Sequence, residues 1–177
     1  MSTNNILRYP IGKFKAPKNF TDELREEFIS EIEETPFHLR SAVENLDEDQ
    51  LNTPYRQGGW TVEQVIHHLP DSHMNAYIRV KLALTENKPV IKAYDQDAWA
   101  KLEDYRTTPI ETSLQLLDSV HTRWIILLRS LTPDQFKRPM QHPEIGLITI
   151  DWCVAQYAWH GKHHIAQINS LKQRMGW

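Results

Sequence analysis

The sequence predicts an all-α protein, a four-helix bundle formed by a single domain over residues 1–177. Three observations predict this fold: four long stretches with apolar residues at helical spacing, helix-starting motifs at their heads, and almost no alternating strand pattern. A chain of 177 residues can bury one complete core and is short for two domains. Residues 1–20 carry Pro10 and Pro17, so we expect them to form an irregular N-terminal arm.

The first helix is expected over residues 21–46. Thr21 is suited to cap it, because a threonine hydroxyl can accept a hydrogen bond from an unpaired backbone N–H of the first turn. Pro36 lies inside this stretch and lacks the N–H that the helix needs. We therefore expect a kink or a brief break near Glu34.

The second helix begins more clearly, after the Gly-Gly pair at 58–59. Thr61 and Gln64 have the spacing of a capping box, and helical periodicity continues to about Glu86. Pro70 interrupts the pattern and removes one backbone hydrogen bond.

A long connection follows over residues 87–107, of which DQDAWAKLEDY can form a short helix. A link of ~20 residues can span the length of a bundle, whereas short links join antiparallel neighbours. The second and third long helices can therefore run parallel, with the long crossover between them. The predicted order is up-down-down-up.

The third helix is predicted to start with another capping box, with Thr108 as the cap, Pro109 in the first turn and Glu111 three residues after the cap. Its apolar positions continue to Leu131.

The last part of the chain predicts a short helix, a turn and the fourth long helix. Thr132 begins another capping box, and HPEIGLIT at 142–149 indicates a turn with a strand-like edge. The fourth helix is expected over residues 150–175, with Gly176 as its stop.

Composition excludes several classes of protein. The net charge of −3 and the scattered lysines and arginines argue against a nucleic-acid partner. The one cysteine, Cys153, excludes an internal disulfide framework and fits a reducing compartment. No apolar run approaches the ~18 residues that a membrane span requires. We expect a soluble, cytoplasmic protein that acts on a small molecule.

The nine histidines are the main indication of function in this sequence. His160 and His164 are spaced i,i+4, so they lie on one helix face and can reach one metal ion. The segment VIHHLPDSH at 65–73 can supply a third ligand. His67 and His68 point ~100° apart, so only one of them faces the bundle, and spacing alone leaves the choice open.

Four segments carry a family resemblance. GGWTVEQVIHHLPDSH and YAWHGKHHIAQI, together with YPIGKF near the N-terminus and the closing LKQRMGW, resemble the DinB/YfiT-like superfamily and its YfiT branch. The resemblance covers nearly the whole chain. It implies an up-down-down-up four-helix bundle with a three-histidine site for a divalent metal, and a homodimer.

The resemblance also selects the ligands. In the family's first motif the ligand follows the tryptophan by eight residues, so Trp60 selects His68 rather than His67; the second motif supplies His160 and His164. Related chains often have a small or aliphatic residue where this chain has Pro70, and a proline there can bend the helix just after His68. We expect one divalent ion per chain, Zn²⁺ first and Ni²⁺ second, because both suit imidazole ligands.

Three neutral imidazoles leave a coordination position open, as in catalytic rather than structural zinc sites. Such a site can activate water for hydrolysis, and the family is described as metal-dependent hydrolases. It can equally activate a thiol, and relatives include S-transferases that use a low-molecular-weight thiol such as bacillithiol or mycothiol. A third interpretation is a non-enzymatic metal-binding or stress module, in which protein groups fill every coordination position.

Other residues have weaker predicted roles. Asp71, three residues after His68, is a weak candidate for a catalytic base or for orienting a ligand. His163 is interpreted as a neighbour of the site or a surface group, and His121 as facing either the metal cavity or the exterior. His67 and His73 are expected on the surface or at a subunit contact. Cys153 is expected to be a small buried residue, and Trp60 part of the cavity wall.

Overall fold

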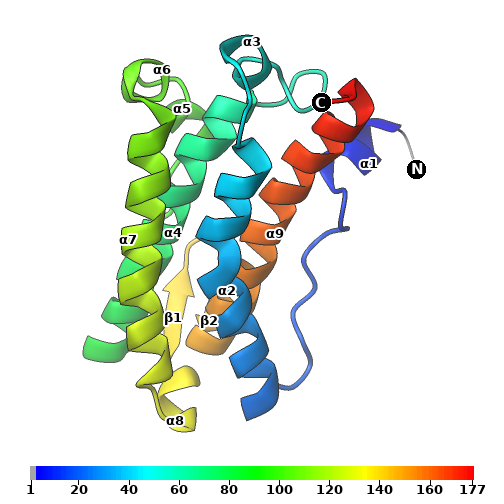
Figure 1. The fold of residues 1–177 in the computed structure, drawn as a ribbon. Helices are drawn as coiled ribbons and strands as arrows, with labels where there is room; N and C mark the ends of the chain where they lie inside the picture. Colours follow the sequence, from blue (N-terminus) through cyan, green and yellow to red (C-terminus); the bar gives the residue numbers. More distant parts are fainter. Residues whose placement is uncertain (1–2) are drawn as a thin grey trace.

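The computed structural model describes residues 3–177, and four long helices dominate it. Figure 1 shows them side by side as a bundle, which confirms the predicted all-α, four-helix fold. The first helix ends at Val43, three residues earlier than expected, and the other three agree closely with their predicted ranges. The long helices are α2 (Asp22–Val43), α4 (Val62–Thr85), α7 (Ile110–Arg129) and α9 (Ile150–Met175).

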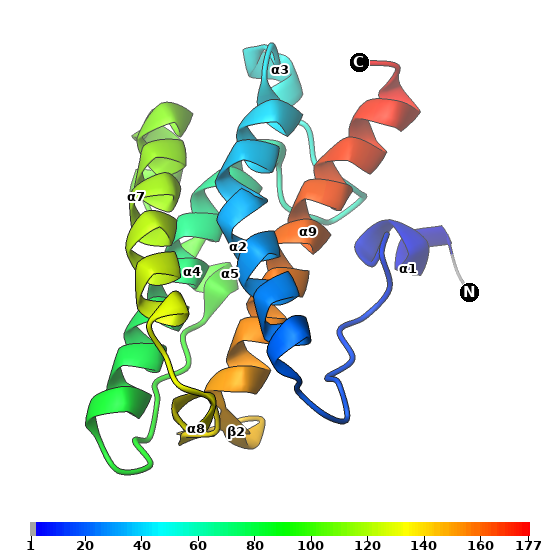
Figure 2. The ribbon, with the colours of Figure 1, turned by 60° about the horizontal axis from the view of Figure 1, so that its bottom comes forward.

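The helices follow the predicted up-down-down-up order. Helices α2 and α9 run in one direction, and α4 and α7 run in the other (Figures 1 and 2). Helix α2 packs against α9 and α7, while α4 packs against α7 and α9. The consecutive long helices α4 and α7 are therefore parallel neighbours, which requires the chain to return along the bundle between them. The contact between α4 and α9 brings the two histidine-rich segments together.

Most of the predicted helix starts form as expected. Thr61 accepts a hydrogen bond from the backbone N–H of Gln64, and the Gln64 side chain accepts one from the backbone of Thr61. The Thr132 box that precedes α8 (Pro133–Phe136) is likewise complete. The box predicted at Thr108 is wrong, because Pro109 occupies the capping position and no side chain among residues 3–177 caps α7. Gly176 ends α9 in the left-handed conformation that favours glycine.

The connections contain more regular structure than the sequence predicts. The crossover holds two short helices, α5 (Gln96–Trp99) and α6 (Asp104–Thr107), and the turn region is an antiparallel hairpin of β1 (Pro139–His142) and β2 (Gly146–Thr149). A one-turn helix, α3 (Glu48–Leu51), follows α2.

The N-terminal arm is not wholly irregular. Residues Thr3–Arg8 form a short helix, α1, which contacts α9. The expectation of a fully irregular arm over residues 1–20 is wrong here, because packing against α9 stabilises a turn of helix that is too short to be stable alone. Residues 1 and 2 lie outside the described part of the chain.

Two prolines lie inside long helices without breaking them. Helix α2 continues through Pro36 and α4 continues through Pro70. The break expected near Glu34 therefore does not occur. Each proline leaves the carbonyl four residues before it without its usual helical N–H partner, which is Ile32 in α2 and Ile66 in α4.

The core is divided along the bundle into two apolar clusters. One is centred on Trp124, Leu128 and Tyr157, and the other on Leu39, Ile66 and Ile168. Between them lie buried polar side chains, mostly histidines. Since an unpaired polar group in a core costs free energy, this layer requires hydrogen bonds or a bound ion.

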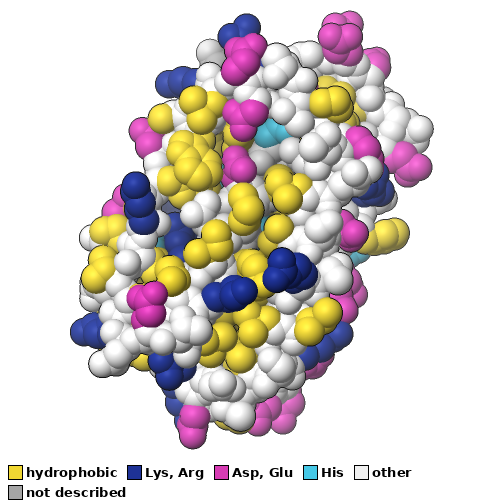
Figure 3. Space-filling model, turned by 90° about the vertical axis from the view of Figure 1, so that its left-hand side faces the viewer, with side chains coloured by type: hydrophobic (Ala, Val, Ile, Leu, Met, Phe, Trp, Pro, Cys, Tyr) yellow, Lys and Arg dark blue, Asp and Glu magenta, His cyan; other side chains and the backbone are white. Residues whose placement is uncertain are grey.

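The outer surface of the bundle is partly apolar on one side. Figure 3 views the side on which α7 and α4 lie in Figure 1, where hydrophobic side chains gather with lysines and arginines beside them. The ring of Tyr77 on α4 has two cationic neighbours: Lys81, at 5.1 Å from the ring centre, and Arg123 of α7, at 5.8 Å. Within residues 3–177, no helix is long and apolar enough to cross a membrane.

Candidate metal centre

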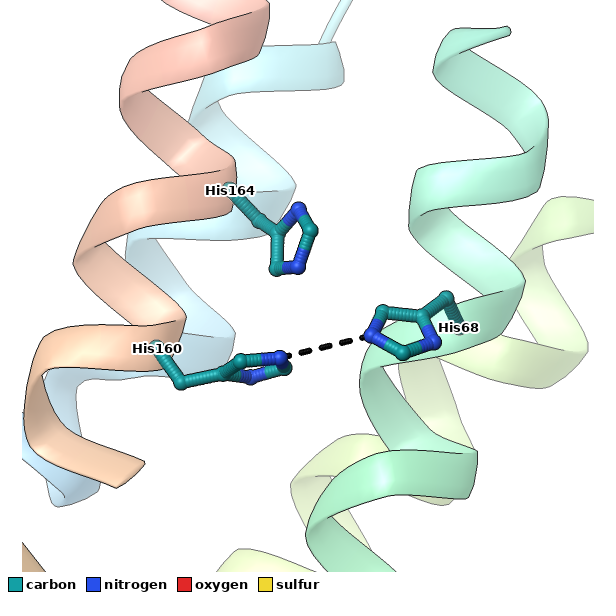
Figure 4. A group of neighbouring side chains, drawn as sticks. All are labelled: His68, His160 and His164. Carbon is teal, nitrogen blue, oxygen red and sulfur yellow. Dashed lines mark hydrogen bonds between the residues drawn. The ribbon is translucent and has the colours of Figure 1, made fainter. Parts of the chain in front are cut away.

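Three histidines from two neighbouring helices converge inside the bundle. His160 and His164 project from successive turns of α9 toward His68 on α4 (Figure 4). One nitrogen from each ring lies within 4.8 Å of the others, and Nε2 of His68 is 3.3 Å from Nε2 of His160. All three side chains are buried. The structure thus brings together the three residues that the family motif selected.

The adjacent residues His67 and His68 on α4 face different helices. Both are buried, because α4 lies between α9 and α7 and successive side chains point to different neighbours. His68 faces α9, whereas Nδ1 of His67 lies 2.7 Å from the hydroxyl of Ser113 on α7. The expectation that His67 lies on the surface is wrong, because α7 covers the side of α4 that His67 faces.

Burial keeps the three imidazoles neutral near pH 7. Desolvation lowers the pKa of His68 to about 3. It also lowers the pKa of His160 and of His164 well below the ordinary value, and neighbouring histidines add repulsion between positive charges. A neutral imidazole has one nitrogen with a free lone pair, which is the form that binds a metal ion.

A glutamine orients His164. The amide nitrogen of Gln167 donates to the main-chain carbonyl of Arg8 at 2.9 Å, so the amide oxygen faces Nδ1 of His164, also at 2.9 Å. An amide oxygen only accepts hydrogen bonds, and Nδ1 of His164 must therefore be its N–H donor. The free lone pair of His164 is then on Nε2. The sequence gave no signal for this role of Gln167.

These residues fit a divalent metal ion. The 3.3 Å between the facing Nε2 atoms of His68 and His160 suits two donors that each lie ~2.1 Å from one ion. Nδ1 of His68 is buried and has no hydrogen-bond partner among the described residues. Three neutral nitrogen donors match the preference of Zn²⁺ and Ni²⁺ for imidazole.

A cavity of about 320 Å³ lies beside the triad, and His160 and His164 form part of its wall. Arg8 and Arg56 bring positive charge to it, and Asp97 is the one carboxylate among its lining residues in the described part of the chain. The site is therefore accessible to a small, polar molecule.

Aromatic rings and the N-terminal arm shape this cavity. The Trp60 ring lies 4.7 Å from the His68 ring and 6.3 Å from that of His164, and its Nε1 donates to Asp97 at 3.1 Å. Tyr9, from the arm, stacks on His163 at 5.6 Å. Trp60 is in the cavity wall as predicted, and the arm closes a side of the site that the four long helices leave open.

Other predicted residues lie around the triad rather than in it. Nε2 of buried His163 accepts from Gln167 at 3.0 Å, and its ring stacks on Trp159. Asp71 accepts a hydrogen bond from the hydroxyl of Tyr105 at 2.7 Å and does not line the cavity. Its catalytic role stays a prediction. Cys153 is buried as expected, and burial raises the pKa of its thiol to about 12.

Two further histidines lie in the core, one predicted on the surface and one left open between the metal cavity and the exterior. His73 was expected on the surface, but it is fully buried, and its Nε2 lies 3.1 Å from Nδ1 of His160. His121 is also buried and lies 2.9 Å from His73. The surface prediction for His73 is wrong because it considered only α4, and α7 and α9 cover that position in the bundle.

Comparison with known proteins identifies the family. A model of the DinB superfamily matches residues 22–168. A protein of Oceanobacillus iheyensis is 54% identical over 170 residues, which are 96% of this chain and 98% of that one. A protein of Bacillus cereus strain G9842 is 50% identical over 173 residues, or 98% and 99% of the two chains. Both carry the name "putative metal-dependent hydrolase".

Solved structures agree with this assignment. YfiT from Bacillus subtilis, described as a probable metal-dependent hydrolase with an unusual four-helix bundle topology, matches with a TM-score of 0.94 at 50% identity and covers 97% of this chain and 99% of its own. The four-helix bundle protein TT2238 has a TM-score of 0.57 at 18% identity, over 86% of this chain and 99% of its own, and shows the fold alone. The chain therefore belongs to the DinB superfamily, in the YfiT-like branch that its motifs indicated.

Proposed function

We propose that the protein is a divalent-metal-dependent enzyme of the hydrolase type. The observation that carries the proposal is the convergence of three neutral imidazoles, from His68, His160 and His164, beside a cavity that a small molecule can enter. The names of the Oceanobacillus and Bacillus relatives support it. One ion per chain is expected, Zn²⁺ first and Ni²⁺ second.

A bound divalent ion with an open position supplies Lewis acidity and lowers the pKa of a water molecule to about 7. The residues of the chain then position the reactants. Trp60 restricts solvent at the His68 ring, and Tyr9 of the N-terminal arm covers His163 beside the ligands. Arg8 and Arg56 attract a negatively charged part of the substrate.

A base must take the proton that water loses when its oxygen bonds to the substrate carbon. We propose the carboxylate of Asp97, which lines the cavity, and it can return that proton to the leaving group. Asp71 is the competing prediction. Its position beside Tyr105 makes it better suited to hold α4 and α6 together. Asp97→Asn should then lower kcat with metal content unchanged, and Asp71→Asn should lower stability more than kcat.

Metal content is the decisive measurement for the site. Purified wild-type protein should contain about one divalent ion per chain, and His68→Ala and His160→Ala should lose it. His67→Ala is the matched control, because it removes the adjacent buried imidazole, which pairs with Ser113. Retention of metal in His68→Ala together with loss in His67→Ala would overturn the ligand assignment.

Activity should then be measured on labile esters and amides. Hydrolysis should require the metal, disappear with a chelator and return when the ion is restored. A metal-loaded protein with no activity above that of the free ion, and with protein groups in every coordination position, would instead support the non-enzymatic binding module.

The second candidate is a thiol S-transferase, which the cationic cavity wall favours. Arg8 and Arg56 can bind the carboxylates of a low-molecular-weight thiol such as bacillithiol. In that reaction the thiol sulfur bonds to an electrophilic carbon as the leaving group departs, and the thiol proton passes to a base. Consumption of one thiol per product, with a raised KM for the thiol in Arg56→Gln, would identify this activity.

The homodimer implied by the family resemblance also stays a prediction. Sedimentation equilibrium at micromolar concentration should give twice the mass of the chain. A mass equal to one chain over that range would contradict it.

A further inference from the structure

The polar layer between the two apolar clusters includes a side chain from each long helix. On α2 it contains Thr35, on α4 His73, on α7 His121 and on α9 His160, all of them buried. In each long helix, these polar residues separate the apolar residues of the cluster around Trp124 from those of the cluster around Leu39. Polar groups at such depth are stable only if hydrogen bonds satisfy them.

The three histidines of this layer form a continuous chain of hydrogen bonds. Nδ1 of His121 lies 2.6 Å from the main-chain oxygen of Ile32, and its Nε2 lies 2.9 Å from Nδ1 of His73. Nε2 of His73 lies 3.1 Å from Nδ1 of His160. The chain therefore starts at the backbone of α2, crosses α7 and α4, and ends at a metal ligand on α9.

Pro36 makes the first link available. In an α-helix the carbonyl of Ile32 would accept the N–H of residue 36, but proline has no N–H. The carbonyl oxygen of Ile32 therefore has no helical partner, and it accepts a hydrogen bond from Nδ1 of His121 instead. The proline that looked like a helix breaker in the sequence thus provides an acceptor inside the core.

The direction of every hydrogen bond follows from that carbonyl. A carbonyl oxygen can only accept, so Nδ1 of His121 carries a proton, and the bare Nε2 of this neutral ring accepts from Nδ1–H of His73. By the same rule, the bare Nε2 of His73 accepts from Nδ1–H of His160. Nε2 of His160 is left with its lone pair directed at the triad.

We propose that His121 and His73 are positioning residues, which hold His160 in the tautomer and ring orientation that present its Nε2 to the metal. This inference rests on the proposed metal site and adds to it a specific role for two buried histidines. It also explains why the polar layer extends across the whole bundle, well beyond the ligands themselves.

The second ligand of α9 is held in a similar way. His164 is fixed through Gln167 by the carbonyl of Arg8, as His160 is fixed through two imidazoles by the carbonyl of Ile32. In both cases a main-chain acceptor decides which ring nitrogen is free. Groups that orient a metal-bound histidine typically contribute 10–100-fold to metal affinity.

Nitrogen NMR of metal-free protein tests the proposed directions of these hydrogen bonds. With ¹⁵N-labelled histidine at pH 7.5, His121, His73 and His160 should all show the proton on Nδ1. His68 should carry its proton on Nε2, since it must donate to the bare Nε2 of His160. A proton on Nε2 of His160 in the wild type would overturn the proposal, and this measurement requires no variant.

Metal affinity tests the consequence. His121→Phe keeps a planar aromatic ring at this position but removes both hydrogen bonds, so competition with a chelator should show Zn²⁺ binding weakened about 10–100-fold, with a mixed tautomer at His160. His67→Phe is the matched control, because it makes the same change at a buried imidazole that does not belong to the row of hydrogen-bonded histidines. Equal affinity in His121→Phe and wild type would overturn the proposal. A wild type that binds no metal would overturn the proposed function. The NMR result would still show whether the hydrogen bonds from Ile32 to His160 exist as proposed.

Discussion

Gly161 on α9 and Thr35 on α2 lie in direct contact at the level of the metal site. A Cβ atom at position 161 would be 2.7 Å from both Cγ2 and Oγ1 of Thr35, closer than side chains approach one another. Thr35 is buried, and its hydroxyl donates to the carbonyl of Glu31. The distance between α2 and α9 beside His160 therefore depends on the absence of a side chain at 161.

Gly161→Ala should lower the free energy of unfolding. Overpacking costs about 1–3 kcal/mol, which exceeds the gain of about 1 kcal/mol from the better helix propensity of alanine. In a Thr35→Ala background, the same change should become neutral or stabilising, because both branches of Thr35 are gone. Urea denaturation of the four proteins measures this. An equal effect in both backgrounds would show that the contact is not responsible.

Metal-free protein should become less stable as the pH falls from 6.5 toward 4. Burial lowers the pKa of His121 to about 4, whereas an unfolded chain protonates histidine near its ordinary value of 6.5. Below that value the unfolded state binds a proton that the folded state excludes, and each such histidine costs about 1.4 kcal/mol per pH unit. Urea midpoints at pH 7.5, 6 and 5 should decrease in turn, with a shallower slope for His121→Phe. A flat profile would contradict the buried, neutral state.

Asp151→Asn should be strongly destabilising. Arg25 binds both carboxylate oxygens of Asp151, at 2.7 and 3.0 Å, and both side chains are buried. Removing the Asp151 charge leaves the buried Arg25 guanidinium with the exposed Asp22 as its remaining carboxylate partner, so the cost should lie near the lower end of the about 3–5 kcal/mol for a broken buried pair.

Glu111→Gln is the matched control for Asp151→Asn. Arg40 binds Glu111 through two hydrogen bonds of 2.7 and 3.0 Å, but both side chains are about half exposed. Loss of this pair should cost less than about 1 kcal/mol. Similar losses from the two variants, measured by urea denaturation, would show that burial is not what distinguishes the pairs.

Pro36→Ala should separate stability from metal affinity. Alanine is the better helix former, so the free energy of unfolding should stay the same or increase. The restored N–H would compete with His121 for the carbonyl of Ile32, and Zn²⁺ should bind more weakly than to the wild type, though less weakly than to His121→Phe. A chelator competition and a urea titration measure the two effects. An unchanged affinity would mean that the carbonyl accepts both donors.

Much of the fold and part of the site could be predicted from the sequence by itself. Helical periodicity determines the four long helices, since their apolar faces and caps are local properties of the chain. The length of the crossover determines that α4 and α7 run parallel. The i,i+4 spacing of His160 and His164 determines a pair of ligands on one face, and the family motif selects His68 as the third.

Only the tertiary structure decided the surroundings of these ligands. Whether His67 or His73 is buried depends on which helices flank α4, and no local pattern contains that information. The use of the Ile32 carbonyl by His121 joins residues 89 positions apart in the chain. Hydrogen bonds between distant helices depend on how the helices pack, so the groups that orient the ligands become visible only when the bundle is assembled.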